Sequence, residues 1–133
     1  MRKLTPILTV EAIEPCLPFW TDVLGFEVPV TVPHEDTIGF AILQKDGVEL
    51  MYQTRASIDA DLGESDAPAE LGRELAGGSA LLFVEVDAID PLLPKLDGVE
   101  VVVPRRRTFY GMDEVFVRAP CGTVVGFAAK VEE

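Results

Sequence analysis

One short segment occurs twice in this chain, and this repeat limits the possible folds more than any other feature. Residues 9–18 read TVEAIEPCLP, and residues 85–94 read EVDAIDPLLP. A second related pair follows at 25–30 (GFEVPV) and 98–103 (GVEVVV). Such a repeat predicts two copies of one structural unit. The interval between the two segments is shorter in the second copy, so we expect the shorter helix there.

Each copy opens with a strand-like segment that leads into a helix start. The segments LTPILTV at 4–10 and ALLFVEV at 80–86 are rich in the aliphatic and β-branched residues that favour strands. Glu-Pro at 14–15 and Asp-Pro at 90–91 then place a carboxylate and a proline where the first amides of a helix have no partner. A strand followed by a helix is therefore predicted in both copies.

Three further strands are predicted in each copy. The turn KDG at 45–47 separates two alternating segments, and its glycine supplies the positive φ of a tight hairpin. We expect these strands at 25–30, 36–44, 47–53, 99–103, 113–119 and 123–129. The result is an α+β chain of two β-α-β-β-β modules. We expect one domain over 1–133, with module one at 1–53, an acidic linker with one helical turn at 54–78, and module two at 79–133.

The composition narrows the class of partner. With 23 acidic and 11 basic residues, the net charge is -12, which repels nucleic acid and anionic membranes and attracts cationic ligands. No apolar run reaches the length of a membrane span, and the first residues lack the apolar core of a signal peptide. The two cysteines are expected to be reduced thiols, with a single disulfide bridge as the alternative. We therefore expect a cytoplasmic protein with neither a nucleic-acid nor a membrane partner.

Three motifs carry a resemblance to a known family. They are VEA and VDA at 10–12 and 86–88, FWTDVLGF at 19–26, and APCG at 119–122, where Ala119 replaces the usual Asp. With them the chain resembles the vicinal oxygen chelate superfamily, which includes glyoxalase I, bleomycin-resistance proteins and extradiol dioxygenases. This resemblance implies tandem βαβββ modules forming half-barrels around a cup, a small-molecule ligand in that cup, and a homodimer.

The same resemblance implies where a metal would be held, with one ligand on the first and one on the last strand of each module. Those positions are Thr5, Glu49, Leu81 and Gly126. Only Glu49 is a good ligand for a transition metal, and such a site needs about three protein ligands. We therefore predict no metal, no cofactor and no catalytic residue, as in the bleomycin-resistance branch. His34, the sole histidine, is expected in a solvated loop, with an unorthodox site at 34–36 as the alternative.

Strand alternation selects the side chains that would face the cup. The predicted ligand-binding residues are Glu49, Met51, Phe83, Glu85, Arg107, Phe109 and Tyr110. Glu49 would bind a cationic or donor-bearing group; its alternative is a solvated carboxylate at the rim. The basic run at 105–107 would bind an anion beside two aromatic rings; its alternative is a solvated loop whose arginines balance nearby acids.

These observations predict a protein whose function is binding, without a metal, of a cationic or aromatic small molecule such as an antibiotic. The alternative is an enzyme of the same superfamily. It would be a lyase, isomerase or dioxygenase, acting through displaced metal ligands or through acid–base chemistry at Glu49. A third interpretation is an assembly module whose cup is filled by its own side chains.

Overall fold

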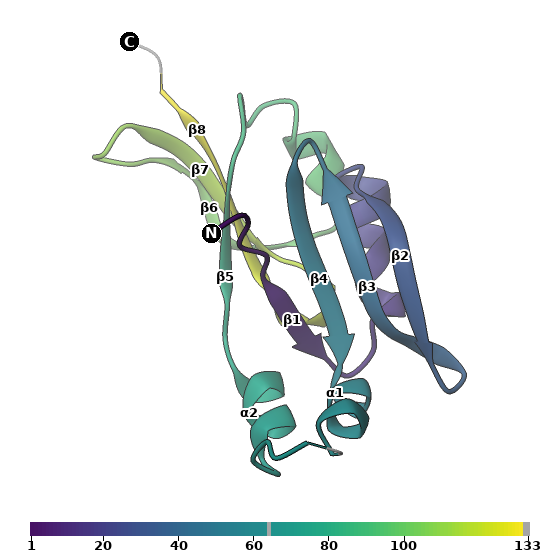
Figure 1. The fold of residues 1–133 in the computed structure, drawn as a ribbon. Coiled ribbons are helices and arrows are strands. Elements are labelled where there is room, and N and C mark those ends of the chain that lie inside the picture. The colour runs from purple at the N-terminus through teal and green to yellow at the C-terminus, as the bar shows by residue number, and fades with distance from the viewer. Residues whose placement is uncertain (64, 132–133) are drawn as a thin grey trace. The chain divides into compact units, whose positions relative to one another are not determined.

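The structure is a computed structural model that describes residues 1–63 and 65–131. It divides into two compact units, Met1–Gly78 and Ser79–Glu133, called unit 1 and unit 2 below. Each unit holds one four-stranded sheet (Figure 1). Among the described residues, no helix has the length and apolar character needed to cross a membrane.

The sheet of unit 1 has the strand order β1-β4-β3-β2. Its strands are β1 (Ile7–Val10), β2 (Glu27–His34), β3 (Thr37–Lys45) and β4 (Val48–Thr54). β1 runs parallel to β4, and the other neighbours are antiparallel. The predicted hairpin between β3 and β4 turns through Asp46 and Gly47, at φ 50° and 80°. Positive φ at both central residues is the geometry that matches the twist of the two strands.

A helical segment of unit 1 packs against one face of this sheet. It comprises η1 (Glu14–Cys16) and η2 (Phe19–Val23), and η2 is wound as a π-helix in which the Leu24 N–H reaches back five residues to the Phe19 carbonyl, at 3.2 Å. Trp20 is buried here, and its indole N–H donates to the Tyr52 hydroxyl of β4 at 2.9 Å. This hydrogen bond ties the helical segment to the middle of the sheet.

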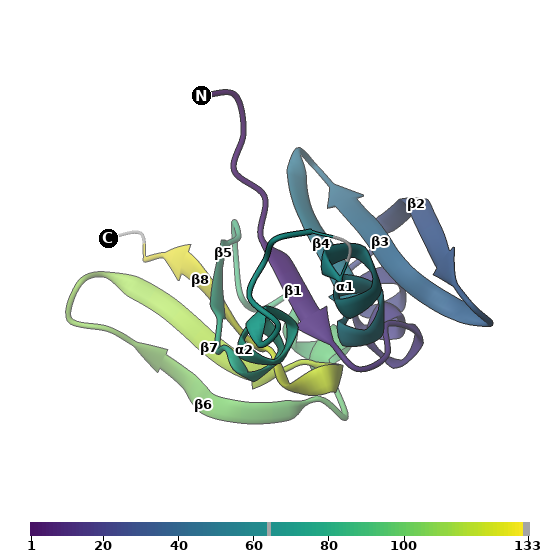
Figure 2. The same cartoon turned by 60° about the horizontal axis from the view of Figure 1, so that its bottom comes forward.

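Residues 54–78 differ from the expected linker with one helical turn. They form two helices, α1 (Arg55–Leu62) and α2 (Leu71–Gly77), which contact each other within unit 1 (Figure 2). Thr54 ends β4 and caps α1, because its side-chain oxygen accepts a hydrogen bond from the Ser57 N–H at 3.1 Å. Ile58 of α1 is buried. One cap and one buried side chain do not make a periodic apolar pattern. The sequence of this acidic, alanine-rich segment therefore did not predict α1.

Unit 2 repeats the topology of unit 1 in the order β5-β8-β7-β6. Its strands are β5 (Leu81–Glu85), β6 (Glu100–Arg107), β7 (Met112–Arg118) and β8 (Val124–Lys130), and β5 runs parallel to β8 as β1 does to β4. The helical position between β5 and β6 holds only the short turn η3 (Leu93–Leu96), and a second short turn, η4 (Pro120–Gly122), joins β7 to β8. The tandem βαβββ fold class and the shorter second helix are both confirmed.

Alternation along β3 and β4 gives the sheet of unit 1 one core face and one more exposed face. In unit 2 the exposed side chains of one face come from β5, whereas β8 is buried on both faces from Val125 to Ala129. In β4, Leu50 and Tyr52 are buried, while the alternating residues Glu49 and Met51 are half-buried. In β8 and β7, Val125, Phe127 and Val117 belong to the core of unit 2. The faces opposite these core residues are called the open face of unit 1 and the open face of unit 2.

Candidate functional site

The open face of unit 1 carries a mixture of apolar and polar side chains in register across the sheet. Two rows cross it, one through Ile7, Met51, Ile42 and Val30, the other through Thr9, Gln53, Phe40 and Val32. Glu49 faces Gln44 at the end of the face beside the β3–β4 turn. Of the predicted ligand-binding residues, Glu49 and Met51 therefore lie on this one surface.

Glu49 lines a hollow of about 580 Å³ that belongs to unit 1 alone. The hollow is lined by Lys3, Gly25, Glu27, Gln44, Lys45, Asp46, Gly47, Val48 and Glu49. The Glu49 carboxylate forms an ion pair with the Lys3 ammonium and accepts a hydrogen bond from the Gln44 amide at 3.4 Å. Its side chain is only 10% exposed, whereas that of Lys3 is 61% exposed. Glu49 is therefore a carboxylate in a recess, and its partner is the ammonium of the exposed and flexible Lys3 side chain.

These contacts also determine the charge of Glu49. The hydrogen bond from Lys3 lowers the pKa of Glu49 below its ordinary value, and burial opposes this effect only in part. Glu49 is therefore anionic at neutral pH. A carboxylate with a lowered pKa is a weak proton acceptor, so this environment suits cation binding better than general base catalysis.

The open face of unit 2 is also arranged in rows across its strands. One row contains Phe83, Gly126, Phe116 and Val103, and the next contains Glu85, Ala128, Glu114 and Arg106. Phe83 is 55% exposed. The predicted ligand-binding residues Phe83 and Glu85 therefore share this face with three side chains that the sequence analysis did not select: Arg106, Glu114 and Phe116.

Glu114 is the most deeply buried charged residue of this face, with 0% exposure. Its carboxylate accepts hydrogen bonds from Arg106 Nε at 3.1 Å and Arg106 Nη2 at 2.9 Å. The Tyr110 hydroxyl donates to the same carboxylate, at 3.0 Å from Oε1. A buried carboxylate needs such donors to offset its lost hydration. The alternating segment DEVFVRA placed Glu114 on the same side as Phe116, and that was the signal available in the sequence.

The other arginines of the basic run lie on the opposite face. Arg107 pairs in register with Asp113, and Arg105 forms ion pairs with Asp113 at 2.8 Å and Asp90 at 2.6 Å. Arg105 lowers the pKa of the Asp113 carboxyl, and both acids raise the pKa of Arg105. Arg105 and Arg106 therefore balance nearby acids, as the alternative expected, but residues 105–107 belong to strand β6 and not to a loop. The pairing of β6 with β7 is irregular between Val103 and Arg106. Because of this shift, Arg106 is the arginine that lies opposite Glu114, and Arg107 lies opposite Asp113.

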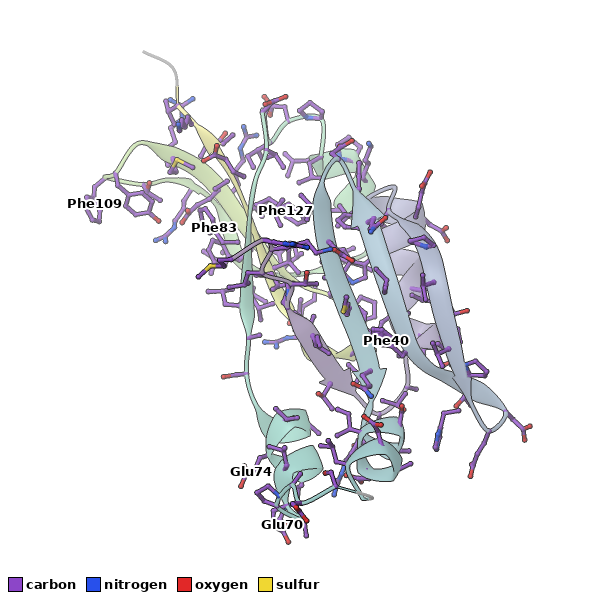
Figure 3. All side chains as sticks on the ribbon, viewed as in Figure 1. Phe40, Glu70, Glu74, Phe83, Phe109 and Phe127 are labelled. Atoms are coloured by element: carbon purple, nitrogen blue, oxygen red, sulfur yellow. The ribbon has the colours of Figure 1, made fainter. Side chains whose placement is uncertain are left out.

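Phe109 and Tyr110, also predicted to bind the ligand, occupy the turn between β6 and β7. Their rings meet edge to face, with centroids 5.1 Å apart. The Tyr110 side chain folds back onto Glu114, whereas Phe109 is 100% exposed at the outer end of the hairpin (Figure 3). The structure thus brings Tyr110, but not Phe109, to the open face of unit 2.

His34 and the cysteines occupy structural positions. His34 is the last residue of β2 and half-buried, so the expected position in a solvated loop is wrong. Its carbonyl accepts a hydrogen bond from the Thr37 hydroxyl at 3.1 Å across the turn. Neither Cys16 nor Cys121 is a free thiol, so the expectation of reduced cysteines is wrong. The cysteines therefore give no argument for a reducing compartment.

The four positions at which the superfamily resemblance would place metal ligands do not form a ligand set in this chain. Leu81 and Gly126 have no donor atom in their side chains, and Glu49 is paired with Lys3. A side chain at 126 would also collide with a neighbour, because a Cβ there would lie 2.8 Å from Cζ of Phe116. Among residues 1–63 and 65–131, no group of three or more His, Cys, Asp or Glu could hold a metal ion. The residues at these four positions are therefore not a suitable ligand set for a transition metal.

Comparisons with known proteins agree with this fold. The model of the Glyoxalase/Bleomycin resistance protein/Dioxygenase superfamily matches residues 4–127. No curated protein sequence matches the chain. Among solved structures, TioX from Micromonospora sp. ML1 has a TM-score of 0.72 at 20% identity, with 98% of this chain and 100% of that chain covered.

Two further solved structures have contrasting names. Lactoylglutathione lyase from Agrobacterium tumefaciens has a TM-score of 0.72 at 17% identity, over 96% of this chain and 92% of that chain. TnmS3, an antibiotic binding protein from Streptomyces sp. CB03234, has a TM-score of 0.63 at 17% identity, over 98% of both chains. At such identities the similarity establishes the fold alone, since one fold carries both catalysis and binding.

Proposed function

The chain belongs to the Glyoxalase/Bleomycin resistance protein/Dioxygenase superfamily, and we propose that within it this protein binds a small molecule without a metal. Its ligand carries a cationic group that is held by Glu49. Binding itself is the function, and it sequesters a compound such as an antibiotic. The name of TnmS3, an antibiotic binding protein, is consistent with this proposal, because it shows that the shared fold can serve binding of such a compound.

The observation that carries this proposal is the ion pair between Glu49 and Lys3. Lys3 belongs to residues 1–6, which form neither strand nor helix, and its side chain is largely exposed. Its ammonium is therefore a stand-in for the cationic group of a ligand, and it marks where such a group would bind. The hollow around Glu49 has the volume of a small-molecule site. The net charge of -12 favours the approach of cations.

The enzymatic alternative is supported less well. A metal-dependent lyase, isomerase or dioxygenase would need ligands that Leu81 and Gly126 do not supply. Acid–base chemistry at Glu49 would be hindered by its lowered pKa. We keep the ligand-binding proposal for Glu49, Met51, Phe83, Glu85 and Tyr110, which lie on the two open faces.

Isothermal titration calorimetry against a panel of cationic antibiotics, including an aminoglycoside and a bleomycin, tests this proposal. Glu49→Gln is expected to weaken binding of a compound from the panel by about tenfold or more, since a charge-assisted contact is lost. Lys3→Met removes the internal competitor and is expected to strengthen binding. Glu11→Gln, at an exposed carboxylate outside the hollow, is the matched control for net charge. Equal effects of the two glutamate variants, or no binding across the panel, would refute the proposal.

We also propose that the protein acts as a cytoplasmic homodimer that binds no nucleic acid. The homodimer is an expectation from the family, and the acidic charge argues against a nucleic-acid partner. Sedimentation velocity at several protein concentrations checks the first point. A single species with the 14.5 kDa mass of one chain would contradict it.

A further inference from the structure

The aromatic ring of Phe116 lies flat on the open face of unit 2. A Cβ built at Gly126 would lie 2.8, 2.9 and 3.0 Å from Cζ, Cε2 and Cε1 of that ring. A ring approaching edge-on would bring Cζ clearly nearer than the two Cε atoms. The nearly equal distances therefore place the Gly126 position close to the ring axis, beneath one face of the ring. The second face of the ring points away from the sheet.

The neighbours of this ring extend the aromatic surface. Gly126 pairs in register with Phe116 on one side and Phe83 on the other, so all three belong to one row. Because Gly126 has no side chain, nothing from β8 stands between the two phenylalanines. Phe83 is 55% exposed and Phe116 is half-buried, although both are large apolar side chains. The row therefore carries two neighbouring aromatic rings that do not belong to the buried core of unit 2.

The adjoining row supplies polar groups of defined charge. Glu114 is fully buried and receives two hydrogen bonds from Arg106, which neutralises it. The Arg106 side chain remains 56% exposed, and its fork of N–H groups has more donors than these two bonds use. Glu85 at the other end of the row is exposed. This row of side chains therefore provides hydrogen-bond donors from Arg106 without a net positive charge.

We propose that the open face of unit 2 is a stacking subsite for an uncharged planar aromatic ring with a hydroxyl or carbonyl substituent. The ring stacks on the outer, partly exposed face of Phe116 with its edge against Phe83, and the substituent oxygen accepts a hydrogen bond from Arg106. Flat rings gain from such offset or edge contacts beyond their buried area. This inference rests on the proposed small-molecule binding function and assigns the ring chemistry of the ligand.

A purely structural role for Phe116 makes a different prediction. An aromatic ring laid over a glycine on the neighbouring strand fills the missing side-chain volume and stabilises the sheet. In that case, loss of the ring lowers stability but leaves ligand affinity unchanged. The exposed Phe83 has no such role, because the ring of Phe116 already covers Gly126. Affinity measurements at both positions therefore separate the two roles.

The probe is 2-naphthol, with trans-decahydro-2-naphthol as the saturated analogue and 2-naphthoate as the anionic analogue. Nuclear magnetic resonance titration of the full chain reports binding and its location together. We expect the ring protons of Phe116 and the naphthol protons to show upfield ring-current shifts. We expect the saturated analogue to bind at least threefold more weakly, and 2-naphthoate to bind more weakly than 2-naphthol because of the acidic charge of the protein. Equal binding of the saturated analogue would overturn the proposal.

The variants are Phe83→Ala, Phe116→Leu and, as matched control, Phe109→Ala. The first two are expected to weaken 2-naphthol binding by about threefold to tenfold each, the size of one aromatic contact. The control removes an equally large ring from the same unit, at the tip of its hairpin (Figure 3), and is expected to leave affinity unchanged. If Phe116→Leu does not fold, Phe83→Ala alone decides. Loss of affinity in the control but not in Phe83→Ala would overturn the proposal.

This outcome is separable from that of the Glu49 experiment. Glu49 lies in unit 1 and its test uses cationic compounds, whereas the stacking test uses uncharged rings and residues of unit 2. If Glu49→Gln weakens binding of an antibiotic while the naphthol titration shows no ring-current shift, the stacking subsite is refuted and the proposed function stands.

Discussion

Replacing Gly126 by alanine tests the geometry on which the stacking subsite depends. The new methyl group would lie 2.8–3.0 Å from three carbons of the Phe116 ring, closer than real Cβ atoms approach their neighbours. Gly126 is buried in the centre of β8, and the sheet holds both residues in register. The ring of Phe116 must therefore tilt away from the sheet or the strands must separate.

The expected cost follows from two opposing effects. Overpacking costs about 1–3 kcal/mol in a packed core, and about 1–2 kcal/mol is expected here, because only the ring at the end of the partly exposed Phe116 side chain has to move. Alanine is favoured over glycine in a strand by about 0.5–1 kcal/mol, because glycine loses more chain entropy on folding. The net loss in the free energy of unfolding is therefore about 0–1.5 kcal/mol. In a Phe116→Ala background the collision is absent, so Gly126→Ala should be neutral or stabilising by up to about 1 kcal/mol.

Urea unfolding of the four proteins in this double-mutant cycle measures the coupling. Circular dichroism is the suitable signal, because the sole tryptophan, Trp20, lies in unit 1 and Gly126 lies in unit 2. A thermal scan should show a fall of up to roughly 6 °C in Tm for Gly126→Ala. If Gly126→Ala changes the free energy of unfolding by the same amount in both backgrounds, the ring of Phe116 does not cover Gly126.

Three further predictions concern unit 1. Tyr52→Phe should lower the free energy of unfolding by about 1–3 kcal/mol, seen by tryptophan fluorescence in urea, because the buried Trp20 N–H loses the hydroxyl that accepts its hydrogen bond; an unchanged midpoint would contradict this. Gly47→Ala should cost about 1 kcal/mol or more, because φ is 80° at this turn position; the same measurement, with a stability equal to the parent, would count against it. The Lys3–Glu49 pair lowers the Glu49 pKa, so its stabilising effect is fully present above the unfolded value of about 4.3 and is lost as pH falls through the lower folded value. Comparing urea midpoints of the parent and Glu49→Gln from pH 7 to pH 2 should therefore show a difference that shrinks only in the acid range, and a difference that is constant over that range would refute this assignment.

Much of the fold could be predicted because its signals are local. The repeat, the alternation of apolar residues and the glycine at 47 each act over a few neighbouring residues, and each was confirmed in the strands and the hairpin. The helical turn expected at 67–75 overlaps α2, whereas α1 was missed because a cap at Thr54 and one buried residue, Ile58, stabilise it without a long periodic pattern. Short helices of this kind depend on packing against neighbouring elements rather than on propensity.

The candidate site was predictable only in part. Strand parity correctly placed Glu49 and Met51 on one face, and Phe83 and Glu85 on another. Parity could not select between adjacent arginines, because the register irregularity in β6 decides that Arg106 faces Glu114 while Arg107 faces Asp113. No run of sequence letters indicates a bulge of this kind when the neighbouring residues are alike.

The amino-acid sequence by itself determined the duplicated strand order and the absence of ligand-bearing side chains at 81 and 126, because both depend only on which residues occur and how they alternate. The tertiary structure alone decided which charges meet. Glu49 lies beside Lys3, 46 positions away along the chain, and Phe116 covers Gly126 only because β7 and β8 are paired in that register. Contacts between residues distant in sequence depend on the packing of whole elements, and this packing created the recess around Glu49 and the flat ring on Gly126.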